Sequence, residues 1–139
     1  MTGLTDLKAM LATLEPTLRE GEFVYACVSA DDAARLPAEA SITEAEGVTV
    51  VLDRRDADMA ELTYDVVLRW ISLGVHSSLE AVGLTAAISQ TLGSAGISCN
   101  VLAGFYHDHL LVPVAQEDEA MRALRGLSRA CQPDDAGAP

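Results

Sequence analysis

Residues 66–112 carry almost no charge, and this feature constrains the fold more than any other in the sequence. The only acidic residues of this segment are Glu80 and Asp108, and its only lysine or arginine is Arg69. All the histidines of the chain lie here as well, namely His76, His107 and His109. Charged residues are seldom buried unless they are paired, so such a segment is expected to be mostly buried or at an interface. Its few ionisable groups are therefore the first candidates for a functional role.

The apolar pattern of this segment predicts a regular order of strands and helices. Residues 66–75 are rich in β-branched side chains, which favours a strand. A helix follows, with Leu84, Ile88 and Leu92 on one face and Gly96 at its C-terminal cap. Two more strands are predicted at residues 97–103 and 109–114, and a final helix ends near Cys131. The order is strand, helix, strand, strand, helix.

The first half of the chain shows the same order in weaker form. Its predicted elements are a helix over residues 4–14 that stops near Pro16, a strand over 23–28, an irregular polar stretch over 30–40, a hairpin of 41–43 with 48–52, and a short helix over 56–62. This repeat predicts an α+β fold of the ferredoxin-like βαββαβ type, with the helices on one face of an antiparallel sheet. We divide the chain into a degenerate unit with its N-terminal helix (1–62), a second unit (63–131) and a disordered tail (132–139).

The number of strands leaves two arrangements open. About six strands are predicted, which is fewer than two complete four-stranded units require. Either the two units share strands, or a second copy of the chain supplies the missing edge. Open sheet edges on two small units favour a homodimer.

Composition excludes several classes of function. The net charge is −12 over 139 residues, and such a surface repels nucleic acid. No apolar run has the length of a membrane span, and residues 1–6 lack the pattern of a signal peptide, so a cytoplasmic protein without membrane contact is expected. Cys27, Cys99 and Cys131 are too widely spaced for a disulfide framework or a zinc site.

Two motifs of the second unit resemble those of an ACT domain. In Val75–Ala87 a loop leaves a strand, reaches Gly83 and enters a helix, which resembles the first loop and helix of that family. Ala103–Pro113 resembles the second hairpin of the ACT subfamily of aspartate kinases and arginine sensors. The whole chain resembles small bacterial tandem-ACT proteins that carry no enzyme domain. The first copy, over residues 22–52, lacks the glycine-containing loop, and the second lacks an obvious last strand.

The resemblance implies that the loop over residues 76–83 binds the α-carboxylate and α-amino groups of an amino acid. A strand-to-helix turn also offers free backbone N–H groups and the positive end of a helix dipole, which suits a carboxylate. The alternative is a capping box of Ser77 and Glu80 that needs no ligand. The candidate ligand-binding residues are His76, Ser77, Ser78, Leu79, Glu80, Ala81, Val82, Gly83, Gly104, Tyr106 and Asp108.

Asp108 is the sharpest candidate because it begins a strand in the charge-poor segment. Its carboxylate could bind an ammonium or guanidinium group, or it could bond to its own turn. Tyr106 could stack on a ligand or lie at a dimer seam. His107 and His109 would share one face of the strand and Asp108 the other, with no third metal ligand nearby. No metal, other cofactor or catalytic residue is therefore predicted.

These patterns favour a non-catalytic sensor that binds an amino acid or a similar small zwitterion and regulates a partner. The alternative is an ACT-like module that only dimerises or binds a protein partner. An enzyme would need a catalytic group assembled from His76, Glu80, His107 and Asp108, and the spacing of these residues indicates no known arrangement.

Overall fold

The computed structural model describes residues 3–76 and 83–133, and the side chains from residue 6 onward within those ranges. The elements, in chain order, are α1 (Gly3–Ala12), β1 (Pro16–Leu18), β2 (Phe23–Val28), α2 (Ala30–Ala33), β3 (Ala40–Glu44), β4 (Gly47–Asp53), α3 (Arg54–Met59), β5 (Leu68–Leu73), α4 (Leu84–Ser94), β6 (Asn100–Ala103), β7 (Asp108–Pro113), a 3-10 turn (Val114–Gln116) and α5 (Glu117–Cys131). The α+β class and the order of the predicted elements are confirmed, and β1 is a further strand that the sequence analysis did not predict. Residues 134–139 of the predicted tail lie outside the described residues.

All the described strands join one antiparallel sheet in the order β3-β4-β2-β5-β7-β6, with β1 paired to β5 off this path. β1 lies against the second half of β5, with Pro16 opposite Leu73 and Leu18 opposite Ile71. The N-terminal segment therefore supplies the last strand of the C-terminal unit. The first half of β5 meets β2 where Phe23 pairs with Leu68. Of the two arrangements left open by the sequence, the units thus share strands within one chain.

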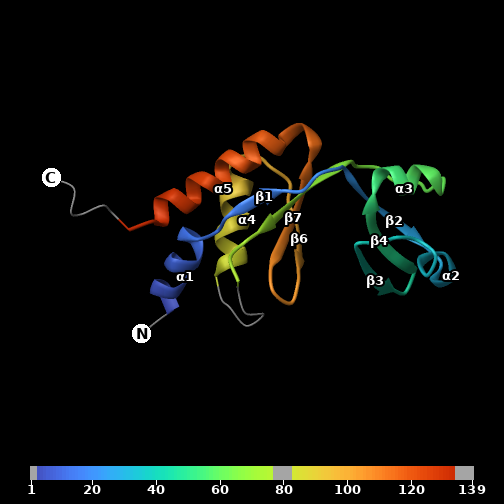
Figure 1. Cartoon of the computed structure of the whole chain (residues 1–139), viewed down its shortest axis with the longest axis horizontal. Coiled ribbons are helices and arrows are strands. Elements are labelled where there is room, and N and C mark those ends of the chain that lie inside the picture. The colour runs from blue at the N-terminus through green and yellow to red at the C-terminus, as the bar shows by residue number, and fades with distance from the viewer. Residues whose placement is uncertain (1–2, 77–82, 134–139) are drawn as a thin grey trace.

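The helices cover one face of this shared sheet, as predicted. Side chains alternate between the two faces of a strand. Val24 and Phe23 therefore lie on different faces of the sheet, and so do Ile71 and Leu68. Val24 packs in a cluster with α3, whereas Ile71 packs in a cluster with α4 and α5. Figure 1 shows α1, α4 and α5 gathered around one end of the molecule, and α2 and α3 around β2, β3 and β4 at the other.

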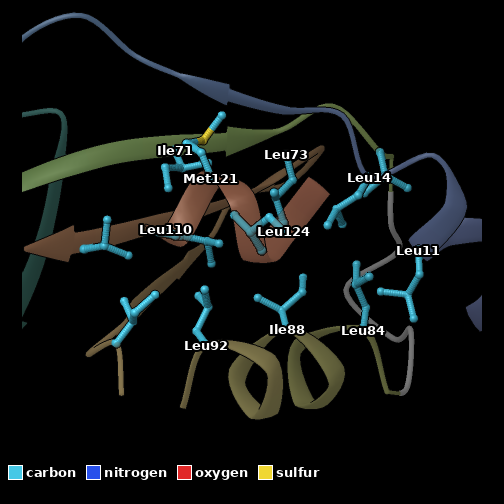
Figure 2. Packing of buried hydrophobic residues seen from close by; sticks show 14 residues of the cluster. Leu11, Leu14, Ile71, Leu73, Leu84, Ile88, Leu92, Leu110, Met121 and Leu124 are labelled. Carbon is cyan, nitrogen blue, oxygen red and sulfur yellow. The ribbon is translucent and has the colours of Figure 1, made fainter. Parts of the chain in front are cut away.

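The larger core lies between α1, α4, α5 and the C-terminal unit's strands. Leu84, Ile88 and Leu92 point from α4 toward Leu110 and Leu124 (Figure 2). Their spacing is the predicted helical stripe. The helix ends at Ser94, and Gly96, which follows the C-cap residue, has the positive φ of +74° that suits glycine. Leu11 and Leu14, from α1 and the turn after it, are also in this core. The predicted division of the chain at residue 62 stays a prediction. It assigns α1 and β1 to the first unit, whereas both pack on the second.

A second cluster lies on the opposite face, where the two units meet. It contains Phe23, Val51, Leu68, Trp70 and Leu111, all at most 5% exposed. The rings of Phe23 and Trp70 are 5.3 Å apart between centroids. The Arg19 guanidinium lies 5.1 Å from each of these rings and pairs with Glu39 at 2.8 Å. This cluster joins the first unit to the second.

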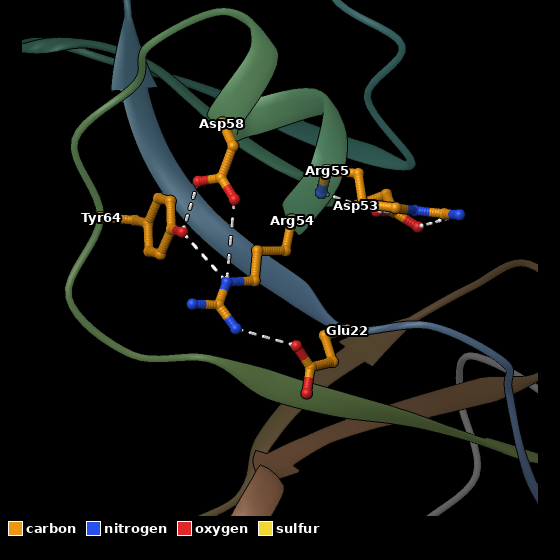
Figure 3. A network of polar contacts seen from close by, with 6 residues as sticks. All are labelled: Glu22, Asp53, Arg54, Arg55, Asp58 and Tyr64. Atoms are coloured by element: carbon orange, nitrogen blue, oxygen red, sulfur yellow. Dashed lines mark hydrogen bonds and ion pairs between the residues drawn. The ribbon is translucent and has the colours of Figure 1, made fainter.

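A polar network fixes the segment that leads from α3 into β5 (Figure 3). Arg54 donates through Nε to the Tyr64 hydroxyl at 3.1 Å and through Nη1 to Glu22 at 3.0 Å. Tyr64 in turn donates to Asp58. Exposed ion pairs add little to stability, so the main consequence of the network is to hold the chain at Tyr64 and Asp65 close to the start of β2.

Candidate functional site

The end of β5, the tip of the β6–β7 hairpin and the turn after α1 meet at one place. The ring of His107 lies 3.3 Å through Nδ1 from the Val75 carbonyl oxygen. His76 faces Tyr106, with 5.7 Å between ring centroids. The backbone N–H groups of Gly74 and Val75 donate to Glu15 and Leu14, at 3.0 and 3.3 Å. Residues far apart in sequence are therefore neighbours around His76.

The hairpin tip depends on Gly104. Its N–H donates to the His107 carbonyl oxygen at 2.9 Å. A Cβ at this position would lie 2.7 Å from the same oxygen, so only glycine permits the close approach. The tip exposes two aromatic residues, with Phe105 73% and Tyr106 61% exposed.

Asp108 is the first residue of β7 and is only 9% exposed. It alternates in phase with Leu110 and Val112, which belong to the core beneath α4 and α5. Asp108 therefore lies on the helix-covered face, and the carboxylate is not in bulk water.

Gly83 sits at the N-cap of α4 with φ of +95°. A Cβ there would lie 3.0 Å from Leu7, so α1 closely approaches the entry to α4. A left-handed conformation at this contact favours glycine. Described helix α4 begins at Leu84. The predicted residues Ser77, Ser78, Leu79, Glu80, Ala81 and Val82, including the capping-box alternative, lie outside the described residues.

An open cavity of about 420 Å³ lies beside His76. It is lined by Ala9, Met10, Thr13, Glu15, Gly74, Val75 and His76. Of the predicted residues that the structure describes, His76 lines the cavity and Gly83, Gly104, Tyr106 and Asp108 do not. Glu15 was missed by the sequence analysis. It has a left-handed φ of +48° directly before Pro16, a position where proline disfavours the helical conformation. The pair Glu15 and Pro16 was the only feature of the sequence that distinguished this position, and it indicates a turn but not a binding site.

The His109 ring lies against Trp70, which belongs to the cluster at the junction of the two units. Its Nδ1 lies 3.0 Å from the Ser72 hydroxyl, and that hydroxyl accepts a hydrogen bond from Trp70 Nε1 at 3.1 Å. The arrangement suits a neutral imidazole whose Nδ1 accepts from Ser72. Burial lowers the pKa of His109, and the charges of His107 and Arg19 lower it further, whereas Asp108 acts in the opposite direction.

This lowered pKa predicts a loss of stability in mildly acidic solution. The unfolded chain binds a proton at His109 below about pH 6.5, and the folded chain does so only at lower pH. The stabilising contribution is therefore full above about pH 6.5 and is lost as pH falls through the folded pKa. Urea midpoints measured at about pH 7.5 and 5.5 should differ less in the His109→Gln variant than in the native chain. An equal difference in both would contradict this role of His109.

Two further observations concern the described residues. Among them, no group of three or more histidine, cysteine, aspartate or glutamate side chains could hold a metal ion. No helix in the described ranges is long and apolar enough to cross a membrane.

Comparison with known protein families gives two matches in tandem. Residues 2–69 and residues 65–126 each match a model of the ACT domain. The two matches meet within the segment that leads into β5, the strand shared by both halves of the sheet. No protein of curated function matches the chain.

Solved structures include relatives at several levels of similarity. A protein of unknown function from Vibrio cholerae, described as a possible transport protein, is 38% identical; the alignment covers 91% of this chain and 98% of that one, with a TM-score of 0.82. A protein from Agobacterium tumefaciens is 18% identical over 81% of this chain and 87% of its own, with a TM-score of 0.62. The regulatory subunit of aspartate kinase from Thermus thermophilus is 11% identical over 83% and 97%, also with a TM-score of 0.62. The last two similarities concern the fold alone. With both halves matched, the chain belongs to the ACT-domain family and contains two ACT domains in tandem.

Proposed function

We propose that this protein is a non-catalytic regulatory sensor that binds an amino acid or a similar small zwitterion at the end of β5. ACT domains are regulatory ligand-binding modules, and the regulatory subunit of aspartate kinase shares this fold. The observation that carries the proposal is the meeting of three distant segments around His76, beside a cavity of about 420 Å³.

The chemistry around His76 supports a zwitterion. Helix α4 begins at Leu84, shortly after His76 in the sequence, and a helix N-terminus favours a ligand carboxylate. The Glu15 carboxylate lines the cavity and offers a partner for the ligand's ammonium group. The predicted binding of an ammonium or guanidinium group by Asp108 stays part of the proposal, as do the predicted roles of Gly83, Gly104 and Tyr106.

The alternative function is a module that dimerises or binds a protein partner without a ligand. The exposed rings of Phe105 and Tyr106 favour it, since large exposed apolar groups side by side often mark interfaces. A homodimer is compatible with both functions, and a ligand could shift the packing that a partner reads. A cytoplasmic location also remains part of the proposal.

Thermal unfolding in the presence of each common amino acid tests the sensor function. A ligand at 100 times its Kd should stabilise the folded protein by about 2.7 kcal/mol, which raises Tm by several degrees. Glu15→Gln and His76→Ala should each remove most of that increase. Asp31→Asn, which removes an exposed acid on α2, should keep it.

Two outcomes would contradict the sensor. One is a chain whose Tm stays constant with every amino acid at millimolar concentration. The other is an increase in Tm that both Glu15→Gln and His76→Ala leave intact. Light scattering on the same samples would then test the alternative, because a module that only dimerises should lose its dimer when Phe105 and Tyr106 become alanine.

A further inference from the structure

A separate groove lies at the junction of the two ACT domains. Its volume is about 280 Å³. Leu68 and Pro113, which pair across β5 and β7, line it. Leu68 begins β5, and His76 follows the end of that strand. The groove and the site around His76 are therefore separated by the length of β5, about 17 Å at the rise of an extended strand. The proposed amino-acid site and this groove are therefore distinct.

The polar lining of the groove comes from both domains. Tyr25 belongs to β2 and Asn100 to β6, Ser98 lies just before β6, and Asp65 lies in the segment that connects the domains. The network around Arg54 and Tyr64 holds that segment and so fixes the position of Asp65.

The charge of the lining selects the kind of ligand. Asp65 supplies a carboxylate, and no lysine, arginine or histidine is among the described residues that line the groove. An anion would meet repulsion there, also from a chain whose net charge is −12. A carboxylate and a tyrosine ring that line the same groove suit an ammonium group, which the carboxylate binds through charge-assisted hydrogen bonds and the ring through cation–π attraction.

Tyr25 adds a neutral hydroxyl group. Burial raises the pKa of its hydroxyl, and the nearby Cys99 raises it further. The phenol therefore stays protonated and uncharged near neutral pH, and its oxygen can accept a hydrogen bond from an ammonium group. Ser98 and Asn100 can donate or accept.

The rest of the groove lining is apolar. Val66, Leu68 and Pro113 line it, and Val66 is 53% exposed although it is a large apolar residue. The volume is just below the usual range for drug-sized ligands, which suits an occupant smaller than a typical drug. We propose that this groove binds a small organic cation, an amine with a short aliphatic body, that contacts both ACT domains at once.

Amide shifts in NMR spectra of the full chain test this proposal with n-butylammonium chloride as the probe. We expect saturable shifts at Tyr25, Ser98 and Asn100 with a Kd of about millimolar order, since the rim is open to solvent. Sodium butyrate, which has the same carbon chain and the opposite charge, should not produce them. Asp65→Asn should weaken binding at least about fivefold.

The matched control is Asp31→Asn, which makes the same change in net charge on α2, away from the groove. It should leave the titration unchanged. The proposal is overturned by linear shifts that do not saturate, by equal shifts with butyrate, or by equal weakening in both variants. Because the probe is not a zwitterion and Glu15 and His76 are not in the groove, these results are independent of the proposed amino-acid site.

Discussion

Deletion of residues 1–18 is expected to unfold the C-terminal ACT domain, although these residues lie at the other end of the chain. The deletion removes β1, the last strand of that domain's sheet. It also removes Leu11 and Leu14, which are 5% and 0% exposed in its core. Burial of each leucine contributes about 1.5–3 kcal/mol, and most domains have only about 5–15 kcal/mol in total. Circular dichroism should show loss of cooperative thermal unfolding.

The backbone contacts of this segment make the same prediction. The carbonyl groups of Leu14 and Glu15 accept from Val75 and Gly74 at the end of β5. Ser128 on α5 donates to the Ala12 carbonyl oxygen at 2.9 Å. Their loss leaves polar groups of the C-terminal domain without partners, which costs further free energy.

Peptide complementation is the control for this deletion. A synthetic peptide of residues 1–18 added to the truncated chain should restore cooperative unfolding, because the interaction needs no covalent link. A peptide with Leu11 and Leu14 replaced by aspartate should not. A truncated chain that unfolds cooperatively at the native Tm without any peptide would contradict the shared-strand arrangement as a source of stability.

The sequence predicted those elements whose pattern is local. β2 was predicted at its observed bounds, and α4 was recognised from leucine and isoleucine at spacings of four. β1 was missed because it has only three residues, Pro16–Leu18, too few for an alternating pattern. It is a strand because β5 offers a hydrogen-bonding edge there, and this partner lies about fifty residues away.

The sequence predicted the candidate site only in part. The position of Asp108 at the start of a strand was predicted from the turn before it, whereas the contact of His76 with Tyr106 was not predicted. Glu15 and the groove at Tyr25 and Asp65 were missed. Those residues are brought together only by the way two units share β5, and no local pattern encodes that arrangement.

The junction predicts the second large effect, which is for Trp70. Replacement by alanine should destabilise the protein by about 3–5 kcal/mol, as for other buried aromatic residues. Trp70 is 5% exposed and lies 5.3 Å from Phe23 and 5.4 Å from His109 between ring centroids. Its loss leaves a cavity between the domains and removes the hydrogen bond to Ser72. Urea unfolding followed by circular dichroism measures the change, since Trp70 is the only tryptophan for fluorescence.

Two matched variants separate the role of the junction from the loss of an aromatic ring. Trp70→Phe keeps a ring against Phe23 and should cost less than the alanine variant. Phe105→Ala removes a ring that is 73% exposed and should change stability by at most about 0.5 kcal/mol. Equal destabilisation by Trp70→Ala and Phe105→Ala would contradict a buried junction. If the junction couples the domains, Trp70→Ala should also make amides of β4 and β7 lose protection at different urea concentrations, whereas the native domains unfold together.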